Sequence, residues 1–271
     1  MNAIQTLNQV NFYNDVTRNA RFTYAEITMA VNDAIYYFID EQVGDPLHRD
    51  PLNLQFTQLV RENLQTLIST STIVPTNGTV ITNRYYSTTP SNILLPATYY
   101  TFLYLSCLID GYTEYSRPTN FNEKGPLLTD SFKHPTNIKT YFNENSTGLT
   151  IYRGVGGTFT SATLDFIRQA LPYSIGTEAN LISSGAGVLT NGASYIATEI
   201  SVHNGVTYPI GVQFTTVNTN LTSGQVILAS LCTSIDLPTK THEEIARRAS
   251  KILLLNSGNI QQAQAVDSEK N

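Results

Sequence analysis

The feature that most constrains this chain is a helical spacing of apolar residues between Thr23 and Gly44. Thr23 and Glu26 stand three apart in T-Y-A-E, so each side chain can accept a backbone N–H at a helix start. The apolar residues that follow recur every three or four positions: Ile27, Ala30, Val31, Ala34, Ile35, Phe38 and Ile39. Gly44 and Pro46 are typical of a helix end. The pattern predicts a helix over 23–43 with one face against a core.

A second helix is predicted near residues 52–70. Asp50 followed by Pro51 is typical of a helix start. The carboxylate can accept a hydrogen bond from a backbone N–H of the first turn, and the N–H that proline lacks would have no partner at that position. The short linker from the first helix favours an antiparallel helical hairpin. The polar segment that follows contains T-N-G-T between β-branched residues, which predicts a β-hairpin near 72–84.

Two more helices are predicted further along the chain. Pro96 opens a segment that is apolar nearly all round, which predicts a central buried helix near 96–115. The T-H-E-E sequence that begins at Thr241 offers a second capping box. Together with the apolar residues that follow it, it predicts a helix near 241–255: Ile245, Ala249, Ile252, Leu253 and Leu255. Beyond it Gln, Ala, Ser and Asn predominate, which indicates a flexible tail over 257–271.

The remaining segments favour strands and irregular structure. Prolines spaced among Asn and Lys predict an extended loop over 117–146 that contacts a partner. G-L-T-I-Y-R and F-T-S-A-T-L-D-F-I predict two strands, the second with one face formed by Thr160, Ala162, Leu164 and Phe166. From Gly176 to Ser230 charges are almost absent, and two N-G pairs among short apolar runs predict paired hairpins.

These elements predict an α+β fold, in which a helical bundle-like part carries an antiparallel β-module. The helices of that part are those near 23–43, 52–70, 96–115 and 241–255. The predicted organisation is a helical part over 1–146, a β-rich module over 147–232, and a segment over 233–256 that returns to the helical part.

Composition excludes several classes of protein. Charged residues make up 14% of the chain and the net charge is -5, which argues against a free nucleic-acid binder because phosphate affinity needs clustered Lys and Arg. No apolar segment approaches the about 20 residues that a membrane-spanning helix needs, so we expect no membrane partner. Cys107 and Cys232 form no metal-binding or redox pair motif and are expected to be small buried thiols.

The sequence shows no catalytic, cofactor-binding or metal-binding motif. No G-x-S-x-G elbow is present, and the four histidines stand singly. His242 is expected in the first turn of a helix, and the others, His48, His134 and His203, in loops. The G-V-G-G segment that begins at Gly154 lacks the Lys of a phosphate-binding loop and is interpreted as a turn. Three N-x-S/T triplets are attributed to chance.

Two other sets of residues are functional candidates. Asp110 and Glu114 stand four apart, but we expect them to solvate the end of the third helix rather than to act as an acid and a base. The 16 tyrosines could stack on sugars or bases. Several fall on predicted helices, so packing in the core and between subunits is the favoured use: Tyr36, Tyr37, Tyr99, Tyr100 and Tyr104.

Several segments, taken in order, resemble a known family. They are an apolar segment ending I-D-G-Y, a D-S-F-K-H-P-T segment from Asp130, G-L-T-I-Y-R followed by L-D-F-I-R, and L-P-T-K-T-H-E-E-I-A-R-R-A. As a series they resemble the ring and connector proteins of crAss-like bacteriophages. Residues 176–230 depart from the shortest pattern of that family and look like an inserted β-module.

The resemblance implies a structural virion protein and not an enzyme. It implies a homo-oligomeric ring, with twelve copies as the expected number, that connects the portal to the tail beside neighbouring ring or tail proteins. Genomic DNA would pass through the ring without sequence-specific binding, and no cofactor or metal is implied. The expected location is the virion neck or tail, after synthesis in the host bacterial cytoplasm.

Two alternatives remain open. A tail-associated protein could bind a host-surface glycan through its β-region. A tail hydrolase would need convergent carboxylates or an activated nucleophile, which the sequence does not display.

Overall fold

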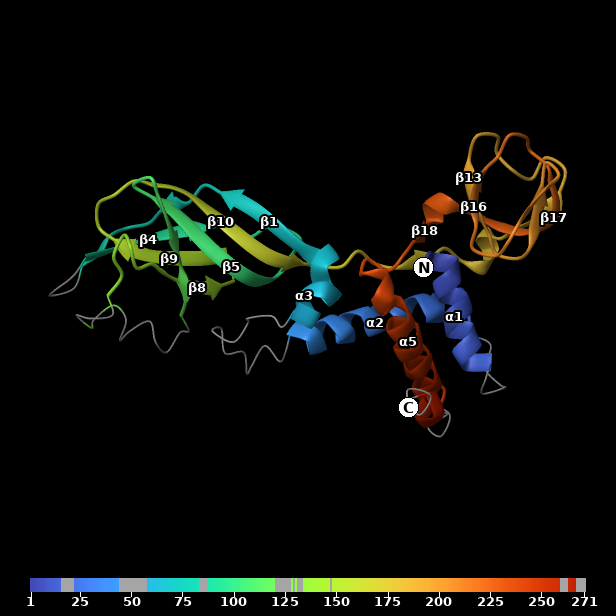
Figure 1. Cartoon of the computed structure of the whole chain (residues 1–271), viewed down its shortest axis with the longest axis horizontal. Coiled ribbons are helices and arrows are strands. Elements are labelled where there is room, and N and C mark those ends of the chain that lie inside the picture. Colours follow the sequence, from blue (N-terminus) through green and yellow to red (C-terminus); the bar gives the residue numbers. More distant parts are fainter. Residues whose placement is uncertain are drawn as a thin grey trace. The chain divides into compact units, whose positions relative to one another are not determined.

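The structure is a computed structural model with an α+β fold, as the sequence predicts (Figure 1). It describes the following residues: 1–15, 22–43, 58–82, 87–119, 128, 130, 134–146, 148–258 and 263–266. The chain divides into two compact units. Unit 1 combines Met1–Pro46, Gln58–Thr66 and Ala170–Asn271, and unit 2 contains Leu67–Gln169.

Three helices form the helical layer of unit 1: α1 (Ala3–Asp15), α2 (Tyr24–Val43) and α5 (His242–Asn256). Helix α5 packs against both α1 and α2 (Figure 1). All seven apolar residues predicted on one face of α2 are buried. The predicted capping box is confirmed, because the Thr23 N–H donates to Glu26 Oε2 at 2.8 Å and the Glu26 N–H donates to Thr23 Oγ1 at 3.3 Å.

Helix α1 is an element that the sequence pattern does not predict. Its buried apolar residues are Ala3, Ile4, Leu7, Val10 and Tyr13, and from Ile4 onward they are spaced three apart. Polar residues interrupt this spacing, and the Asn content of the segment hides it. Tertiary contacts stabilise the helix, since Ser250 of α5 donates to Asn14 Oδ1 at 2.6 Å and the buried Tyr173 hydroxyl donates to the Ala3 carbonyl at 2.8 Å.

Helix α5 lies where the sequence predicts it, but its predicted capping box is wrong. Thr241 ends a 3-10 turn, η4 (Thr239–Thr241), and has the helical angles φ -92° and ψ -11°. A capping residue needs an extended backbone to turn its oxygen toward the next amides. The Thr241 hydroxyl instead donates to the Pro238 carbonyl at 2.8 Å, and Glu244 binds arginines of α5.

The helix predicted near 52–70 is shorter at its C-terminal end. Helix α3 (Gln58–Leu64) is followed by the 3-10 turn η1 (Gln65–Leu67) and then by strand β1 (Ile68–Ile73), while residues 52–57 lie outside the described part of the chain. The I-S-T-S-T-I sequence of β1 alternates β-branched and hydroxyl side chains, which suits a strand. Asn63 Nδ2 donates to Gln42 Oε1 of α2 at 3.1 Å.

Unit 1 also contains a small sheet of short strands, in the order β15-β14-β17-β13-β16, with β12 paired to β17. The strands are β12 (Ile182–Gly185), β13 (Ser194–Ala197), β14 (Ser201–His203), β15 (Val206–Tyr208), β16 (Gln213–Thr215) and β17 (Leu221–Leu228). Two further strands, β11 (Ser174–Ile175) and β18 (Cys232–Thr233), pair with each other. The small sheet has its own apolar core of Leu189, Tyr195, Phe214, Leu221 and Val226.

One of the two N-G pairs forms the predicted hairpin turn. Asn204 and Gly205 have φ of 51° and 75° and join β14 directly to β15, which is the geometry that favours Asn-Gly. The other pair, at Asn191, precedes β13, but β13 pairs with β16 and β17 rather than with the strand before it. The expectation of two paired hairpins is therefore wrong for the first pair.

Unit 2 is a sandwich of two sheets. One sheet has the order β1-β10-β5-β6, and the other has the order β2-β4-β9-β8-β7, with β3 also paired to β4. Strands β9 (Gly148–Gly154) and β10 (Phe159–Arg168) confirm the two predicted strands. The core between the sheets is apolar and includes Leu105, Cys107, Phe142, Ile151, Leu164 and Phe166. Thr160 is exposed, because the strand register shifts between Phe159 and Ser161.

The helix predicted near 96–115 is wrong, and the structure has two strands there. Strands β5 (Tyr99–Ile109) and β6 (Tyr112–Tyr115) form a hairpin across Asp110 and Gly111, with φ of 54° and 82°. Nearly every position of β5 is apolar, so no period could be read from the sequence. The Asp-Gly pair was the available signal, since it favours a two-residue hairpin turn and not a helix end.

The hairpin predicted near 72–84 is also wrong for the described residues. Strands β2 (Thr76–Asn77) and β3 (Ile81–Thr82) each pair with β4 (Ser87–Ile93) and not with each other. Pro90 lies in β4 between the stretch that pairs with β2 and the stretch that pairs with β3. Because proline has no N–H, it cannot donate a hydrogen bond toward this edge of the sheet. Residues 83–84 lie outside the described part.

The predicted extended loop over 117–146 contains two strands in its described part. Strand β7 (Arg117–Pro118) pairs in parallel with β8 (Tyr141–Asn145), which also pairs with β9. The predicted domain boundary at residue 147 therefore falls inside one sheet. The structure divides the chain near Gln169 instead, because β9 and β10 complete the sandwich that begins at β1.

The predicted flexible tail over 257–271 contains an ordered helical turn. Residues 263–266 are helical, and Ala263 and Val266 are buried against Leu254 of α5. These two apolar side chains dock the turn on the helix. Residues 259–262 and 267–271 lie outside the described part.

Candidate interaction site

Two histidines of the described chain are buried as hydrogen-bonded structural residues. His203 lies in strand β14 and not in a loop, with Nδ1 2.8 Å from the Asn220 carbonyl and Nε2 accepting the Val217 N–H at 3.3 Å. His242 begins α5 as predicted, with Nε2 2.7 Å from the Leu237 carbonyl. Burial lowers the pKa of His242, which keeps the imidazole neutral. His134 is half-buried, and His48 lies outside the described residues.

The two cysteines are poor nucleophiles at neutral pH. Burial raises the pKa of the Cys107 thiol to about 12 and that of the Cys232 thiol to about 11. A thiol with so high a pKa carries little thiolate at pH 7. Cys107 is buried as expected, whereas Cys232 is half-buried. Within the described ranges, no group of three or more His, Cys, Asp and Glu residues could hold a metal ion.

The other candidate residues from the sequence have structural positions in the sandwich. Asp110 accepts the Thr158 N–H at 2.7 Å, and Glu114 lies on strand β6. The G-V-G-G segment is a turn between β9 and β10, as predicted. The buried Arg153 stabilises this turn, since Nη1 donates to the Gly156 carbonyl at 2.7 Å.

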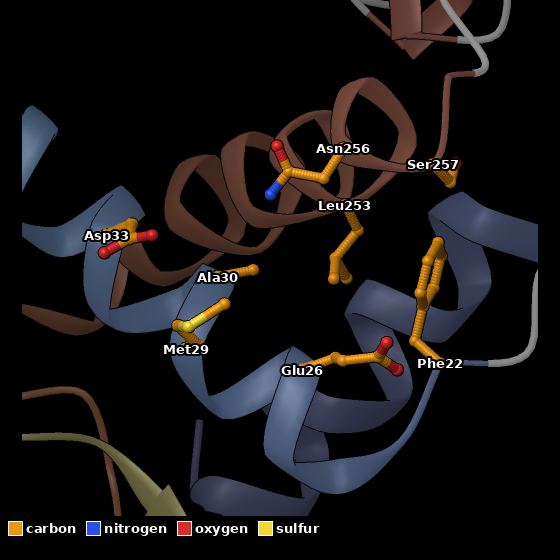
Figure 2. Close-up of a pocket in the computed structure, with 8 residues that line it drawn as sticks. All are labelled: Phe22, Glu26, Met29, Ala30, Asp33, Leu253, Asn256 and Ser257. Carbon is orange, nitrogen blue, oxygen red and sulfur yellow. The ribbon is translucent and has the colours of Figure 1, made fainter.

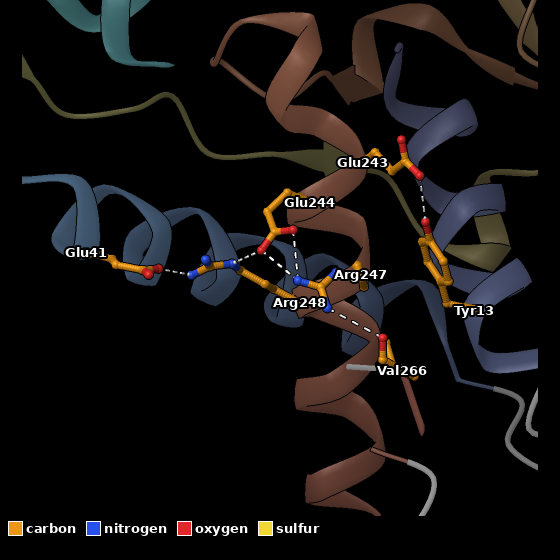
Figure 3. Close-up of polar contacts among 7 residues, drawn as sticks. All are labelled: Tyr13, Glu41, Glu243, Glu244, Arg247, Arg248 and Val266. Carbon is orange, nitrogen blue, oxygen red and sulfur yellow. Dashed lines mark hydrogen bonds and ion pairs between the residues drawn. The ribbon is translucent and has the colours of Figure 1, made fainter. Parts of the chain in front are cut away.

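An ion-pair network links α2 to α5 in the helical layer (Figure 3). Glu244 accepts hydrogen bonds from Arg248 Nε and Arg247 Nη2, both at 2.8 Å, and Arg248 Nη1 lies 2.6 Å from Glu41 of α2. Arg248 also lies over the Phe38 ring, 5.4 Å from its centroid. Burial opposes ionisation of Glu244, but the two arginines outweigh it and lower the pKa of Glu244 to about 2.

The network borders a groove of about 410 Å³ between α2 and α5, which we call the basic groove. Its lining contains three cationic and two anionic side chains beside apolar ones: Ala34, Tyr37, Glu41, Glu244, Arg247, Arg248, Lys251, Ile252 and Leu255. Two large apolar side chains here are open to solvent, since Tyr37 is 64% and Leu255 45% exposed. The groove therefore combines a positive balance with exposed apolar surface.

A second groove of about 170 Å³ lies between α2 and the C-terminal end of α5, and we call it the acidic groove (Figure 2). Phe22, Met29, Ala30 and Leu253 supply its apolar lining, and Asn256 and Ser257 are also present. Its charged residues are Glu26 and Asp33, with no cation among the described residues of the lining. Met29 is 59% exposed.

The two grooves lie on opposite faces of α5. Lys251 and Leu255 are four residues apart and share the face of the basic groove with Arg248. Leu253 is two positions from Lys251, which turns it by about 200° around the helix axis. Helix α5 thus separates a groove with a net positive charge from a groove with a net negative charge.

A third exposed surface is the outer face of the β1-β10-β5-β6 sheet. Tyr104 and Tyr115 lie there with ring centroids 4.9 Å apart and are 42% and 62% exposed. The register places hydroxyl side chains beside them, since Tyr115 is opposite Ser106 and Ser106 is opposite Thr163. Asp165 lies opposite Tyr104 on the same face and accepts a hydrogen bond from the Thr70 hydroxyl at 2.6 Å. The face therefore has hydroxyl groups and one carboxylate around an aromatic pair.

No protein-family model matches this chain, and a search of curated proteins finds no similar sequence. Among the helices that the structure describes, none is both long enough and apolar enough to cross a membrane.

Proposed function

We propose that this protein is a structural subunit of a tailed-phage virion that forms a ring in the neck or tail. The observation that carries the proposal is the pair of grooves flanking α5, of which one has Met29 and the other Tyr37 and Leu255 as exposed large apolar side chains. Exposed apolar surface of this kind, bordered by charges, is typical of protein interfaces. The series of motifs that resembles the ring and connector proteins of crAss-like phages supports the same function.

The chemistry of the basic groove supports assembly over catalysis. A general acid or base works best with a pKa near neutrality. The pKa of Glu244 is instead lowered to about 2, and its carboxylate is held by two arginines. A carboxylate in this state orders the helices around it and stays ionised at any physiological pH.

The partners proposed for the ring are further copies of the chain, the portal, and neighbouring ring or tail proteins. The net charge of -5 suits a ring around a DNA channel, because a mildly repulsive lumen lets DNA slide without holding it. We place the protein in the virion after synthesis in the host bacterial cytoplasm.

Imaging of intact virions tests this function. The chain would be fused to a small epitope tag at its C-terminus, and virions would be labelled with a gold-conjugated antibody and imaged by electron microscopy. The expected label lies on the axis between capsid and tail, and averaged images of that region show closed rings. Label on fibres or on the capsid shell, with none on that axis, would contradict the proposal.

A second candidate function is recognition of a host-surface glycan. The Tyr104–Tyr115 pair favours it, because sugars stack on exposed aromatic rings and hydrogen-bond to neighbouring hydroxyl groups. The small sheet of unit 1 favours it less, since Tyr195 and Phe214 are buried in its core.

Polysaccharide binding by single variants tests the glycan alternative. Tyr104→Ala and Tyr115→Ala are each expected to weaken binding at least about tenfold if the pair stacks on sugar. Tyr112→Ala is the matched control, because Tyr112 is 71% exposed but lies opposite Ile109, whose side chain faces the core. No binding by the wild-type chain, or equal loss in all three variants, would exclude this face as the binding surface.

A further inference from the structure

We propose that the acidic groove of one copy docks head-to-tail onto the basic groove of the next copy. This inference rests on the proposed ring function and adds the interface through which the ring closes. The occupant of each groove is thus a second copy of this chain. The charges, the exposed side chains and the positions of the two grooves each support it.

Charge complementarity is the first argument. The acidic groove has two carboxylates, Glu26 and Asp33, and no cation among the lining residues that the structure describes. The basic groove has three cations against two carboxylates, and both carboxylates are bound by arginines of α5, Glu244 by Arg247 and Arg248 and Glu41 by Arg248. Two copies that meet groove to groove bring opposite charges together, whereas like grooves would repel each other.

The exposed apolar side chains are the second argument. The exposed apolar side chains are Tyr37 and Leu255 at the basic groove and Met29 at the acidic groove, which are 64%, 45% and 59% exposed. Covering these groups removes large apolar surface from water, which is the main favourable term in association. Aromatic residues and Met are enriched in such contacts, and Met adapts its shape to a partner.

The positions of the grooves decide the symmetry of the contact. A twofold dimer uses the same patch on both subunits, but here the complementary patches are different and lie on opposite faces of α5. Each copy that docks therefore leaves one acidic and one basic groove open at the two ends of the assembly. Such a heterologous contact propagates and closes as a ring when the rotation between copies allows it.

Charge reversal at the two grooves tests the contact. Asp33→Lys replaces one of the two carboxylates of the acidic groove with a cation, and Lys251→Glu turns the net charge of the basic groove from positive to negative. Each variant alone places two like charges opposite each other at every contact. Sedimentation and mass photometry of the full chain would measure self-association over a concentration series. The wild type is expected to form oligomers larger than dimers, and each single variant to raise the apparent dissociation constant at least about tenfold.

Mixing the two single variants gives the decisive readout. In an alternating assembly the lysine introduced by Asp33→Lys would face the glutamate introduced by Lys251→Glu, and the native Asp33 and Lys251 would face each other at the next contact. An equimolar mixture is therefore expected to assemble at lower concentration than either variant alone. The double variant Asp33→Lys with Lys251→Glu is expected to regain self-association.

Glu199→Lys is the control for these variants. Glu199 is exposed in the small β-region outside both grooves, so this variant should assemble like the wild type.

The possible failures separate this inference from the ring function. Wild-type rings that resist both charge reversals, or a mixture that does not recover assembly, would overturn the groove contact and leave the ring function standing. A wild-type chain that stays monomeric at the highest soluble concentration would overturn self-docking. Circular dichroism of each variant would confirm that its helices are intact, and the virion imaging decides the ring function independently of these residues.

Discussion

The sandwich of unit 2 and the helical layer of unit 1 are stabilised by different kinds of contact. The sandwich core is a continuous apolar cluster between two sheets, with Leu105, Leu164 and Ile151 almost fully buried. The helical layer also depends on polar contacts across its helices, such as the Ser250–Asn14 hydrogen bond and the Glu244–Arg248 ion pair. Apolar packing tolerates changes of pH, whereas ion pairs depend on protonation. The layer with the grooves is therefore also the part whose stability depends on charge.

The largest effect is expected from the sandwich core. Leu164→Ala leaves a cavity opposite Leu105 in the sandwich core and should lower the free energy of unfolding by about 3 kcal/mol. Hydrogen exchange under urea would follow each region, and β5 and β10 should lose protection while α2 and α5 retain theirs. Thr163→Ala, on the outer face of the same strand, should cost about 1 kcal/mol or less. Equal loss of protection in both regions would show that the stability of the helical layer depends on the sandwich core as well.

A smaller effect is expected from acid, and only in the helical layer. The pKa of Glu244 is about 2 in the folded chain against an ordinary value of 4.5. The folded state thus binds fewer protons, so this contribution to stability is complete above pH 4.5 and is lost as pH falls toward 2. With allowance for its partial exposure, the loss should be about 2 kcal/mol.

Hydrogen exchange of the α2 and α5 amides between about pH 5 and pH 2.5 would measure this loss. Glu244→Gln should remove most of the pH dependence, because glutamine does not titrate in this range. Glu243→Gln is the matched control. The Glu243 carboxylate is next to Glu244 in the chain and accepts a hydrogen bond from the Tyr13 hydroxyl at 3.1 Å, but it lies outside the arginine network (Figure 3). An unchanged acid response in the Glu244 variant would assign the effect to other groups.

The smallest effect is expected from one buried hydroxyl of the helical layer. Tyr173→Phe removes the donor that satisfies the Ala3 carbonyl and should cost about 1 kcal/mol in unfolding free energy. Tyr36→Phe, on the exposed side of α2, should change stability by no more than a few tenths of a kcal/mol. Chemical denaturation of both variants would measure the difference. Equal values would indicate that the Tyr173 hydroxyl contributes only packing.

Much of the helical layer could be predicted from the sequence, but the site could not. The buried face of α2 and the position of α5 follow from apolar spacing, which reports local geometry. The two grooves depend on where α5 crosses α2, and no local pattern encodes that crossing. Lys251 of α5 and Asp33 of α2, for example, are far apart in the chain. Their positions in grooves on opposite sides of α5 could therefore not be predicted from the sequence.

Local patterns in the chain were enough to specify helices α2 and α5, strands β9 and β10, and the Asn204–Gly205 turn. In each case a short-range period or a residue with a special backbone preference gave the answer. Residues 99–109 became a strand only through their tertiary neighbours, because a uniformly apolar segment fits a buried helix or a buried strand equally well. Pairing with β10 on one side and β6 on the other selected the strand, since it satisfies the backbone hydrogen bonds of a segment buried in the sandwich.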